Sequence, residues 1–89
     1  MSKLSGASAH SDALVLVVED NAHLAFGLQR TLEAQGLRVR VASTGREAID
    51  AVEEDRPSLT ILDLMIPEPD GYAVLEQVRA RGYTAPVLI

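Results

Sequence analysis

Three acidic side chains follow two apolar segments of the chain, and they are the residues best placed to do chemistry. Glu19 and Asp20 come directly after Leu-Val-Leu-Val-Val at 14–18, and Asp63 comes directly after Leu-Thr-Ile-Leu at 59–62. Short apolar runs rich in β-branched residues predict buried strands. Each acid therefore stands where a predicted strand gives way to a loop.

Ligands of open α/β sheets bind beyond the carboxyl ends of the strands, so the position of these acids alone makes them candidates. If the two strands are neighbours, the carboxylates of Glu19, Asp20 and Asp63 converge on one small volume. Like charges at such range repel, and a group of this kind needs a proton or a divalent cation. Taken singly, Glu19 and Asp20 also fit a solvated acidic turn at a helix N-terminus, and Asp63 also fits a turn-forming residue beside prolines.

The loop after Asp63 contains residues that forbid regular structure. Pro67, Pro69 and Gly71 interrupt any helix or strand there, and Pro67 and Gly71 are expected to shape the loop. Asp70 is expected to cap the helix that follows rather than to contact a ligand.

The rest of the chain is predicted to form strands alternating with helices. Beyond Ala13 to Val18 and Leu59 to Leu62, the sequence predicts an edge strand at Leu37 to Val41, which alternates strictly, and a fourth strand at Pro86 to Ile89. Helices are expected from the Asn21 cap to Gln35, from a capping box at Thr44 to Glu47 until Asp55-Arg56-Pro57, and from Tyr72 to Arg81.

The spacing of apolar residues also predicts which helix faces are buried. The first helix would bury Leu24, Leu28, Thr31 and Leu32, the second Ala48, Ile49 and Val52, and the third Val74, Leu75 and Val78. Repeated strand–helix units of this length predict right-handed crossovers and a doubly wound parallel α/β sheet.

Composition excludes several classes of protein. The net charge of −5 and scattered basic residues argue against direct nucleic-acid contact, and the lack of Cys excludes disulfides and thiolate sites. One Phe, two Tyr and no Trp predict an aliphatic core. The apolar run at 13–18 is too short for a signal peptide or a membrane span, so a cytoplasmic protein is expected. Residues 1–12 are rich in Ser, Ala and Gly and have no periodicity, which predicts a disordered tail.

The motifs V-V-E-D-N at 17–21 and I-L-D-L-M-I-P-E-P-D-G at 61–71 resemble the receiver domain of two-component response regulators, from about Leu14 to Ile89. The resemblance implies a flavodoxin-like fold with strand order 2-1-3-4-5. It also implies that Asp63 accepts a phosphoryl group from a sensor histidine kinase or phosphotransfer protein. Glu19, Asp20, Asp63 and the backbone carbonyl of Met65 would hold Mg²⁺.

Such a domain would be a phosphoacceptor rather than a turnover enzyme, and it would switch an output domain or a homodimer partner. The resemblance also calls for a Ser or Thr after strand four and a Lys at the end of strand five. The only Lys is Lys3, so residues 13–89 are expected to be a partial receiver domain.

The sequence is also compatible with other functions. A degenerate receiver would serve only as a docking surface, independent of phosphate. An aspartate-nucleophile phosphatase of the haloacid dehalogenase kind would need a second Asp two residues after the first, where this chain has Met65. A nucleotide-binding domain would need a glycine-rich turn after the first strand, and the segment at 19–22 contains no Gly.

Overall fold

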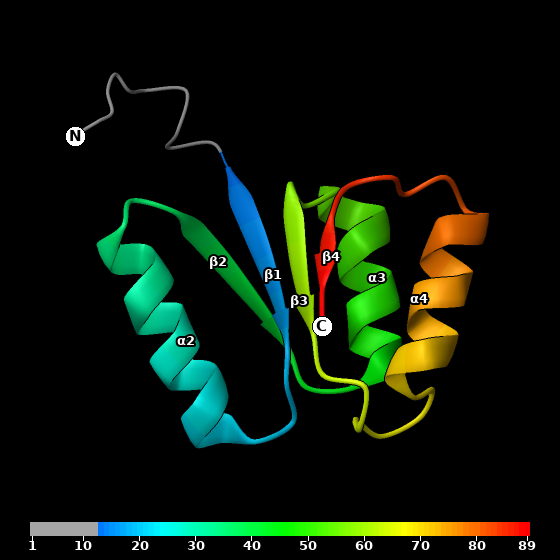
Figure 1. Cartoon of the computed structure of the whole chain (residues 1–89), viewed down its shortest axis with the longest axis horizontal. Helices are drawn as coiled ribbons and strands as arrows, with labels where there is room; N and C mark the ends of the chain where they lie inside the picture. Colours follow the sequence, from blue (N-terminus) through cyan, green and yellow to red (C-terminus); the bar gives the residue numbers. More distant parts are fainter. Residues whose placement is uncertain (1–12) are drawn as a thin grey trace.

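The computed structural model describes residues 13–89. The expected tail at 1–12 lies outside the described residues. Within the described range the chain folds as a parallel sheet with helices on both faces (Figure 1). No helix within residues 13–89 is long and apolar enough to cross a membrane.

Four strands form the sheet in the order β2-β1-β3-β4, and every pairing is parallel. The register brings the last residues of the two inner strands level, because Val18 of β1 pairs with Leu62 of β3. The expected doubly wound parallel sheet is therefore confirmed, and its strands are β1 (Leu14–Val18), β2 (Arg38–Ala42), β3 (Leu59–Leu62) and β4 (Val87–Leu88).

Each helix begins at the cap that the sequence predicted. The Asn21 side chain accepts hydrogen bonds from the backbone N–H groups of His23 and Leu24, Thr44 accepts from Glu47, and Asp70 accepts from Ala73. These contacts satisfy donors that a helix start leaves unpaired. The helices are α2 (Ala22–Ala34), α3 (Gly45–Asp55) and α4 (Gly71–Ala80).

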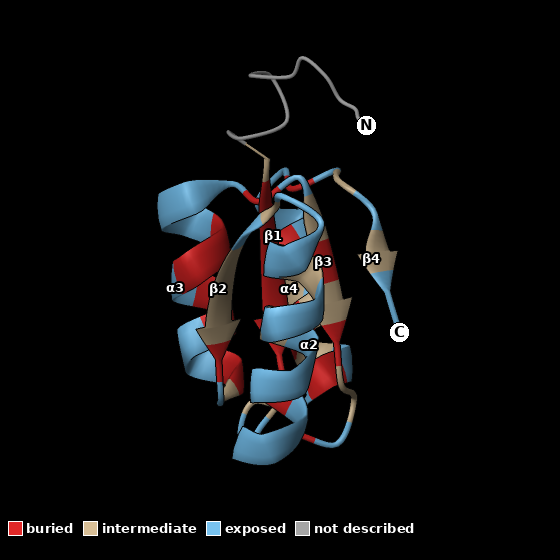
Figure 2. Ribbon diagram, turned by 90° about the vertical axis from the view of Figure 1, so that its left-hand side faces the viewer, coloured by how far each residue is buried: buried red, intermediate tan, exposed pale blue. Residues whose placement is uncertain are grey.

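The two faces of the sheet are covered unequally. Helices α3 and α4 lie side by side on one face, whereas α2 lies on the other (Figure 1). Beneath α3 and α4 the expected stripes are buried, with Leu75 half-buried against the core. Figure 2 shows the buried strand β1 between its neighbours. The core of that face includes Leu16, Val18, Ile49, Val52, Leu62, Val74 and Val78.

The predicted inward stripe of α2 is wrong. Leu24 is 58% exposed and Leu28 is 37% exposed, and Thr31 is also exposed. Ala25 is the buried residue of this helix, with Leu32 half-buried. Because no second helix among the described residues shares this face of the sheet, most residues of α2 remain exposed (Figure 2).

One aromatic residue departs from the expected aliphatic core. Tyr83, in the turn after α4, is 3% exposed and packs within the core cluster. Its hydroxyl donates to the carbonyl oxygen of Pro57 at 2.9 Å and accepts from the Thr60 hydroxyl at 2.8 Å. The buried hydroxyl is thus fully paired, as burial of a polar group requires.

Candidate functional site at the carboxyl edge of the sheet

The three predicted acids meet at the carboxyl edge of the sheet. Glu19 and Asp20 follow β1, Asp63 follows β3, and these strands are direct neighbours. One carboxylate oxygen from each residue can be chosen so that all three atoms lie within 4.8 Å of one another. Glu19 and Asp63 are half-buried and Asp20 is exposed. The convergence predicted from the sequence is therefore observed.

Backbone hydrogen bonds continue the sheet to the two inner acids. The N–H of Glu19 donates to the carbonyl oxygen of Ala42 at 3.0 Å, and the N–H of Asp63 donates to that of Val18 at 3.0 Å. These bonds fix the main chain at the positions from which both carboxylates project. The geometry of the acids is consequently set by the sheet rather than by a free loop.

The pKa of the Glu19 carboxyl group is raised in this site. Burial raises the pKa of its carboxyl group, and the charges of Asp63 and Asp20 and a hydrogen bond with Asp63 raise it further. The Asn21 N–H donates to Glu19 Oε2 at 3.1 Å and opposes part of that rise in pKa. Desolvation and like charge both disfavour the ionised form, and a cation placed among the acids would reverse the effect.

The loop after Asp63 folds back on its own acid. The N–H of Met65 donates to Asp63 Oδ1 at 2.9 Å, which holds that carboxylate in a fixed orientation. Ile66 is buried in the core and anchors the middle of the loop. The Met65 side chain is 84% exposed, so the residue's contribution to a site would come from its backbone.

The remaining residues singled out in this loop, Pro67, Asp70 and Gly71, each make a contact within the loop or with a helix. Asp70 caps α4 as described above. Gly71 is buried, and a Cβ atom built on it would lie 2.8 Å from the carbonyl oxygen of Asp63. Its N–H donates to the carbonyl oxygen of Leu64 at 3.1 Å, which closes the loop. Pro67 is exposed, and its carbonyl oxygen accepts from the N–H of Gly45 at 3.1 Å.

The donor set fits a small hard cation. Carboxylate oxygens with a free backbone carbonyl and water are the ligands that Mg²⁺ prefers, and octahedral ligands at about 2.1 Å from the ion lie roughly 3 to 4 Å apart. The three oxygens, within 4.8 Å of one another, need only a small closure to reach such spacing. No His or Cys belongs to the cluster, which disfavours a site of the zinc type.

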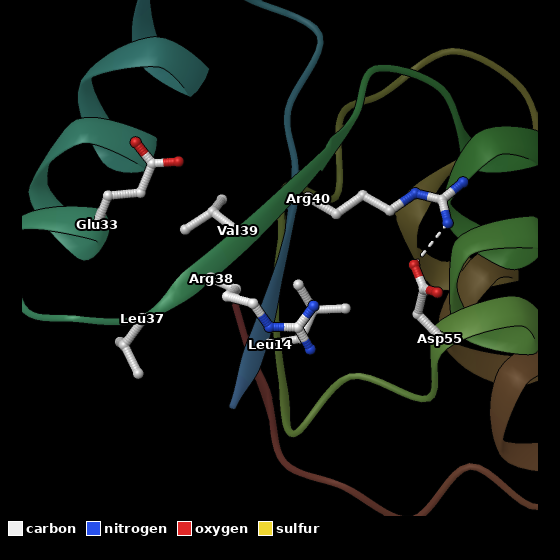
Figure 3. A pocket seen from close by; sticks show the side chains of 7 residues that line it. All are labelled: Leu14, Glu33, Leu37, Arg38, Val39, Arg40 and Asp55. Atoms are coloured by element: carbon white, nitrogen blue, oxygen red, sulfur yellow. Dashed lines mark hydrogen bonds and ion pairs between the residues drawn. The ribbon is translucent and has the colours of Figure 1, made fainter. Parts of the chain in front are cut away.

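A hollow of about 530 Å³ lies away from these acids, along the edge strand β2. Figure 3 shows Glu33 of α2 on one side of it and Asp55 of α3 on the other. Arg40 donates to Asp55 at 2.7 Å and to Glu54 at 2.9 Å, so its charge is already compensated. The hollow also includes Leu14 and Arg38, the first residues of their strands. The hollow is therefore distinct from the group formed by Glu19, Asp20 and Asp63.

Two contacts of the site were not predicted from the sequence. One is the hydrogen bond from Asn21 to Glu19, which follows from the tight turn between β1 and α2. The other is the close approach of Gly45 to the loop after Asp63. A Gly immediately after a predicted helix cap is a detectable signal, but the sequence does not say which segment lies against it.

Comparison with known proteins places the chain. Residues 15–89 match the model of the response regulator receiver domain. The chain is 40% identical over 75 residues to the response regulator MprA of Mycolicibacterium vanbaalenii and 39% identical to MprA of Mycobacterium tuberculosis. These matches cover 84% of this chain but only 32% and 33% of those proteins, so the chain spans about a third of their length.

Solved receiver domains share the fold. The receiver domain of a LuxO repressor protein from Vibrio parahaemolyticus superposes with a TM-score of 0.79 at 32% identity, covering 84% of this chain and 58% of that one. TrrA of Thermotoga maritima, solved in complex with Mg²⁺ and BeF, gives 0.79 at 27% identity, covering 84% and 65%. With the family match, the topology and the acidic edge in agreement, the chain belongs to the response regulator receiver domains of two-component signalling.

Proposed function

We propose that Asp63 is the phosphoacceptor of this receiver and that Glu19, Asp20, Asp63 and the carbonyl oxygen of Met65 hold Mg²⁺ around it. The observation that carries the proposal is the convergence of three carboxylate oxygens within 4.8 Å at the ends of β1 and β3. The match to receiver domains supports the same roles for the same positions.

Phosphoryl transfer to Asp63 requires an oriented carboxylate and a positive charge that offsets the repulsion between the carboxylate and the phosphoryl group. An Asp63 oxygen would attack the phosphorus of a phosphohistidine, forming an O–P bond while the P–N electron pair returns to the imidazole. The N–H of Met65 orients the carboxylate through Oδ1. Mg²⁺, when bound, would supply the positive charge that lets two anions approach. Glu19 and Asp20 would be its remaining side-chain ligands.

The partners in this proposal are a sensor histidine kinase or phosphotransfer protein on the input side, in the cytoplasm, and an output domain or a second receiver on the other. Because Asp63 would be consumed and regenerated rather than turn over a free substrate, the chain would take part in its own phosphorylation without being a turnover enzyme.

The test is phosphorylation of the whole protein by acetyl phosphate with Mg²⁺. One acid-stable, base-labile acyl phosphate is expected in the wild type and none in Asp63→Asn, since Asn is nearly isosteric but is a poor nucleophile. Asp70→Asn is the matched control: it changes an acid in the same loop to another good cap, and its labelling should match the wild type. Undiminished labelling of Asp63→Asn would remove Asp63 from the role and make Asp20 the next candidate.

A phosphate-independent docking module is the second candidate function, and the phosphatase alternative is disfavoured by Met65. The same experiment separates the first two. A receiver that binds its partner equally well before and after acetyl phosphate treatment, with no label at Asp63, would be of the docking type.

A further inference from the structure

Gly45 is the first residue of α3, and the start of that helix lies beside the loop that joins β3 to α4, although the two are far apart in sequence (Figure 1). The N–H of Gly45 donates to the carbonyl oxygen of Pro67 at 3.1 Å. A Cβ atom built on Gly45 would overlap the carbonyl oxygen of Pro69 and would lie 2.8 Å from its carbonyl carbon. The obstacle is backbone, so a larger residue could be accommodated only if the loop and the start of α3 moved apart.

The requirement for glycine here is one of space rather than of conformation. The positive φ angles of glycines in the described chain belong to Gly36 and Gly82, and Gly45 has none. Alanine would also favour the helix more than glycine does. Any harm done by Gly45→Ala must therefore come through displacement of the loop relative to the start of α3.

Displacement of that loop would reach the acidic edge. The segment from Asp63 to Gly71 is held at its ends by the sheet and by the Gly71–Leu64 hydrogen bond, and in its middle by buried Ile66. Gly45 lies against this segment at Pro67 and Pro69, between buried Ile66 and the start of α4. Because Met65 is only two residues before Pro67, we expect a shift there to reach the Met65 backbone through Ile66, and the Met65 N–H orients Asp63.

We propose that Gly45 is a positioning residue for the metal site: its lack of a side chain lets α3 hold the loop so that Met65 and Asp63 present their oxygens together. The inference rests on the proposed function for the identity of the metal. It adds a residue outside both acidic motifs to the set that determines Mg²⁺ affinity.

The principal experiment titrates Mg²⁺ into the whole protein while backbone amide shifts are followed. Gly45→Ala is expected to weaken Mg²⁺ binding by about tenfold or more, the size of effect that residues supporting metal ligands commonly show. It should also shift the amides of residues 65–70 before any metal is added. An unchanged dissociation constant in the folded variant would overturn the proposal.

Two controls separate positioning from general damage. Gly27→Ala makes the same change in α2, where nothing lies within 4 Å of the added atom, and should leave Mg²⁺ affinity unchanged. Val52→Ala opens a cavity in the buried face of α3 and lowers stability without touching the loop. If Val52→Ala weakened Mg²⁺ binding as much as Gly45→Ala, the effect would be one of stability and the proposal would fail.

A measurement on the wild type covers the case in which Gly45→Ala does not fold. Exchange of the Gly45 amide hydrogen, which is donated to Pro67, should slow several-fold when Mg²⁺ orders the loop. The Arg56 amide, donated to Val52 at the other end of α3, should not change. Equal responses at both ends would overturn the proposal.

The outcomes also separate this inference from the proposed function. If Mg²⁺ binds and Gly45→Ala weakens it while Asp63 takes no phosphoryl group, the positioning role stands and the phosphoacceptor proposal falls. If Asp63 is labelled and Gly45→Ala binds Mg²⁺ normally, the reverse holds. A wild type that binds no Mg²⁺ would overturn both.

Discussion

The interior beneath α3 and α4 and the carboxyl edge of the sheet follow opposite rules, although only one residue separates Val18 from Asp20. In the interior, apolar side chains are buried to a few per cent of exposure and the Tyr83 hydroxyl has both a donor and an acceptor. At the edge, three carboxylates crowd one another, and the pKa of Glu19 is raised by burial and by its acidic neighbours.

The contrast teaches where stability and function are located in this fold. Close packing and paired polar groups lower the free energy of the folded state. Clustered like charges raise it unless a cation or proton is bound. Departures from local consistency are expected where a protein carries a site, and here they coincide with the acids that the sequence had already singled out.

The largest effect is expected from opening the interior. Ile49 of α3 is 1% exposed, and Ile49→Ala should reduce the free energy of unfolding by about 2–5 kcal/mol, from lost burial and the cavity left behind. Urea unfolding followed by circular dichroism would measure it. Leu24→Ala on α2 removes an exposed aliphatic side chain and should change stability by no more than about 0.5 kcal/mol. Equal losses would mean that both faces are equally packed.

A smaller effect is expected from breaking the polar pairing in the same interior. Tyr83→Phe keeps the ring but leaves the buried carbonyl of Pro57 without its donor, which should cost about 1–3 kcal/mol. Tyr72→Phe removes the hydroxyl of an exposed tyrosine and is the matched control. If the two variants unfold at the same urea concentration, the buried hydroxyl contributes nothing net.

The sequence predicted much of this arrangement because its signals are local. Strand ends and helix caps follow from adjacent residues, and the parallel order then brings Glu19, Asp20 and Asp63 together. The capping box predicted at Thr44 to Glu47 was correct in one of its two hydrogen bonds, the one from the Glu47 N–H to the Thr44 hydroxyl. Glu47 does reach back, but it accepts from the N–H of Ser43 at 2.8 Å, one residue before the cap.

What sequence patterns did not predict depends on which elements meet. Leu24 and Leu28 have helical spacing, yet within residues 13–89 no other helix joins α2 on its face of the sheet, and both side chains are exposed. In the sequence Tyr83 is an ordinary turn residue, and only the structure shows that its hydroxyl hydrogen-bonds to Pro57 and Thr60. In the sequence Gly45 is an ordinary first residue of a helix, and only the structure shows that the Pro69 backbone lies against it. Periodicity and caps describe one element at a time, whereas these roles are set by contacts between elements.

The smallest effect expected, and one of opposite sign, comes from the carboxyl edge. Because the pKa of Glu19 is raised in the folded state, the folded protein binds more protons than the unfolded chain between the ordinary and the raised pKa. Without divalent cations, stability therefore falls as pH rises through that window. Glu19→Gln lacks this loss and should be more stable than the wild type at neutral pH, by an amount that solvent screening keeps small.

Glu47 is the control for that prediction, because Ser43 lowers its pKa, first through the backbone N–H and then through the hydroxyl. The stability that ionised Glu47 contributes is fully present above the ordinary pKa of Glu. It is lost as pH falls through the lowered pKa of Glu47 in the folded protein. Glu47→Gln should therefore destabilise the protein at neutral pH, opposite to Glu19→Gln. Adding Mg²⁺ after a chelator should stabilise the wild type more than Glu19→Gln, since a ligand of the folded state acts by mass action. If Glu19→Gln were the less stable protein in chelator at neutral pH, Glu19 would be a structural acid, and the contrast between edge and interior would not hold at that residue.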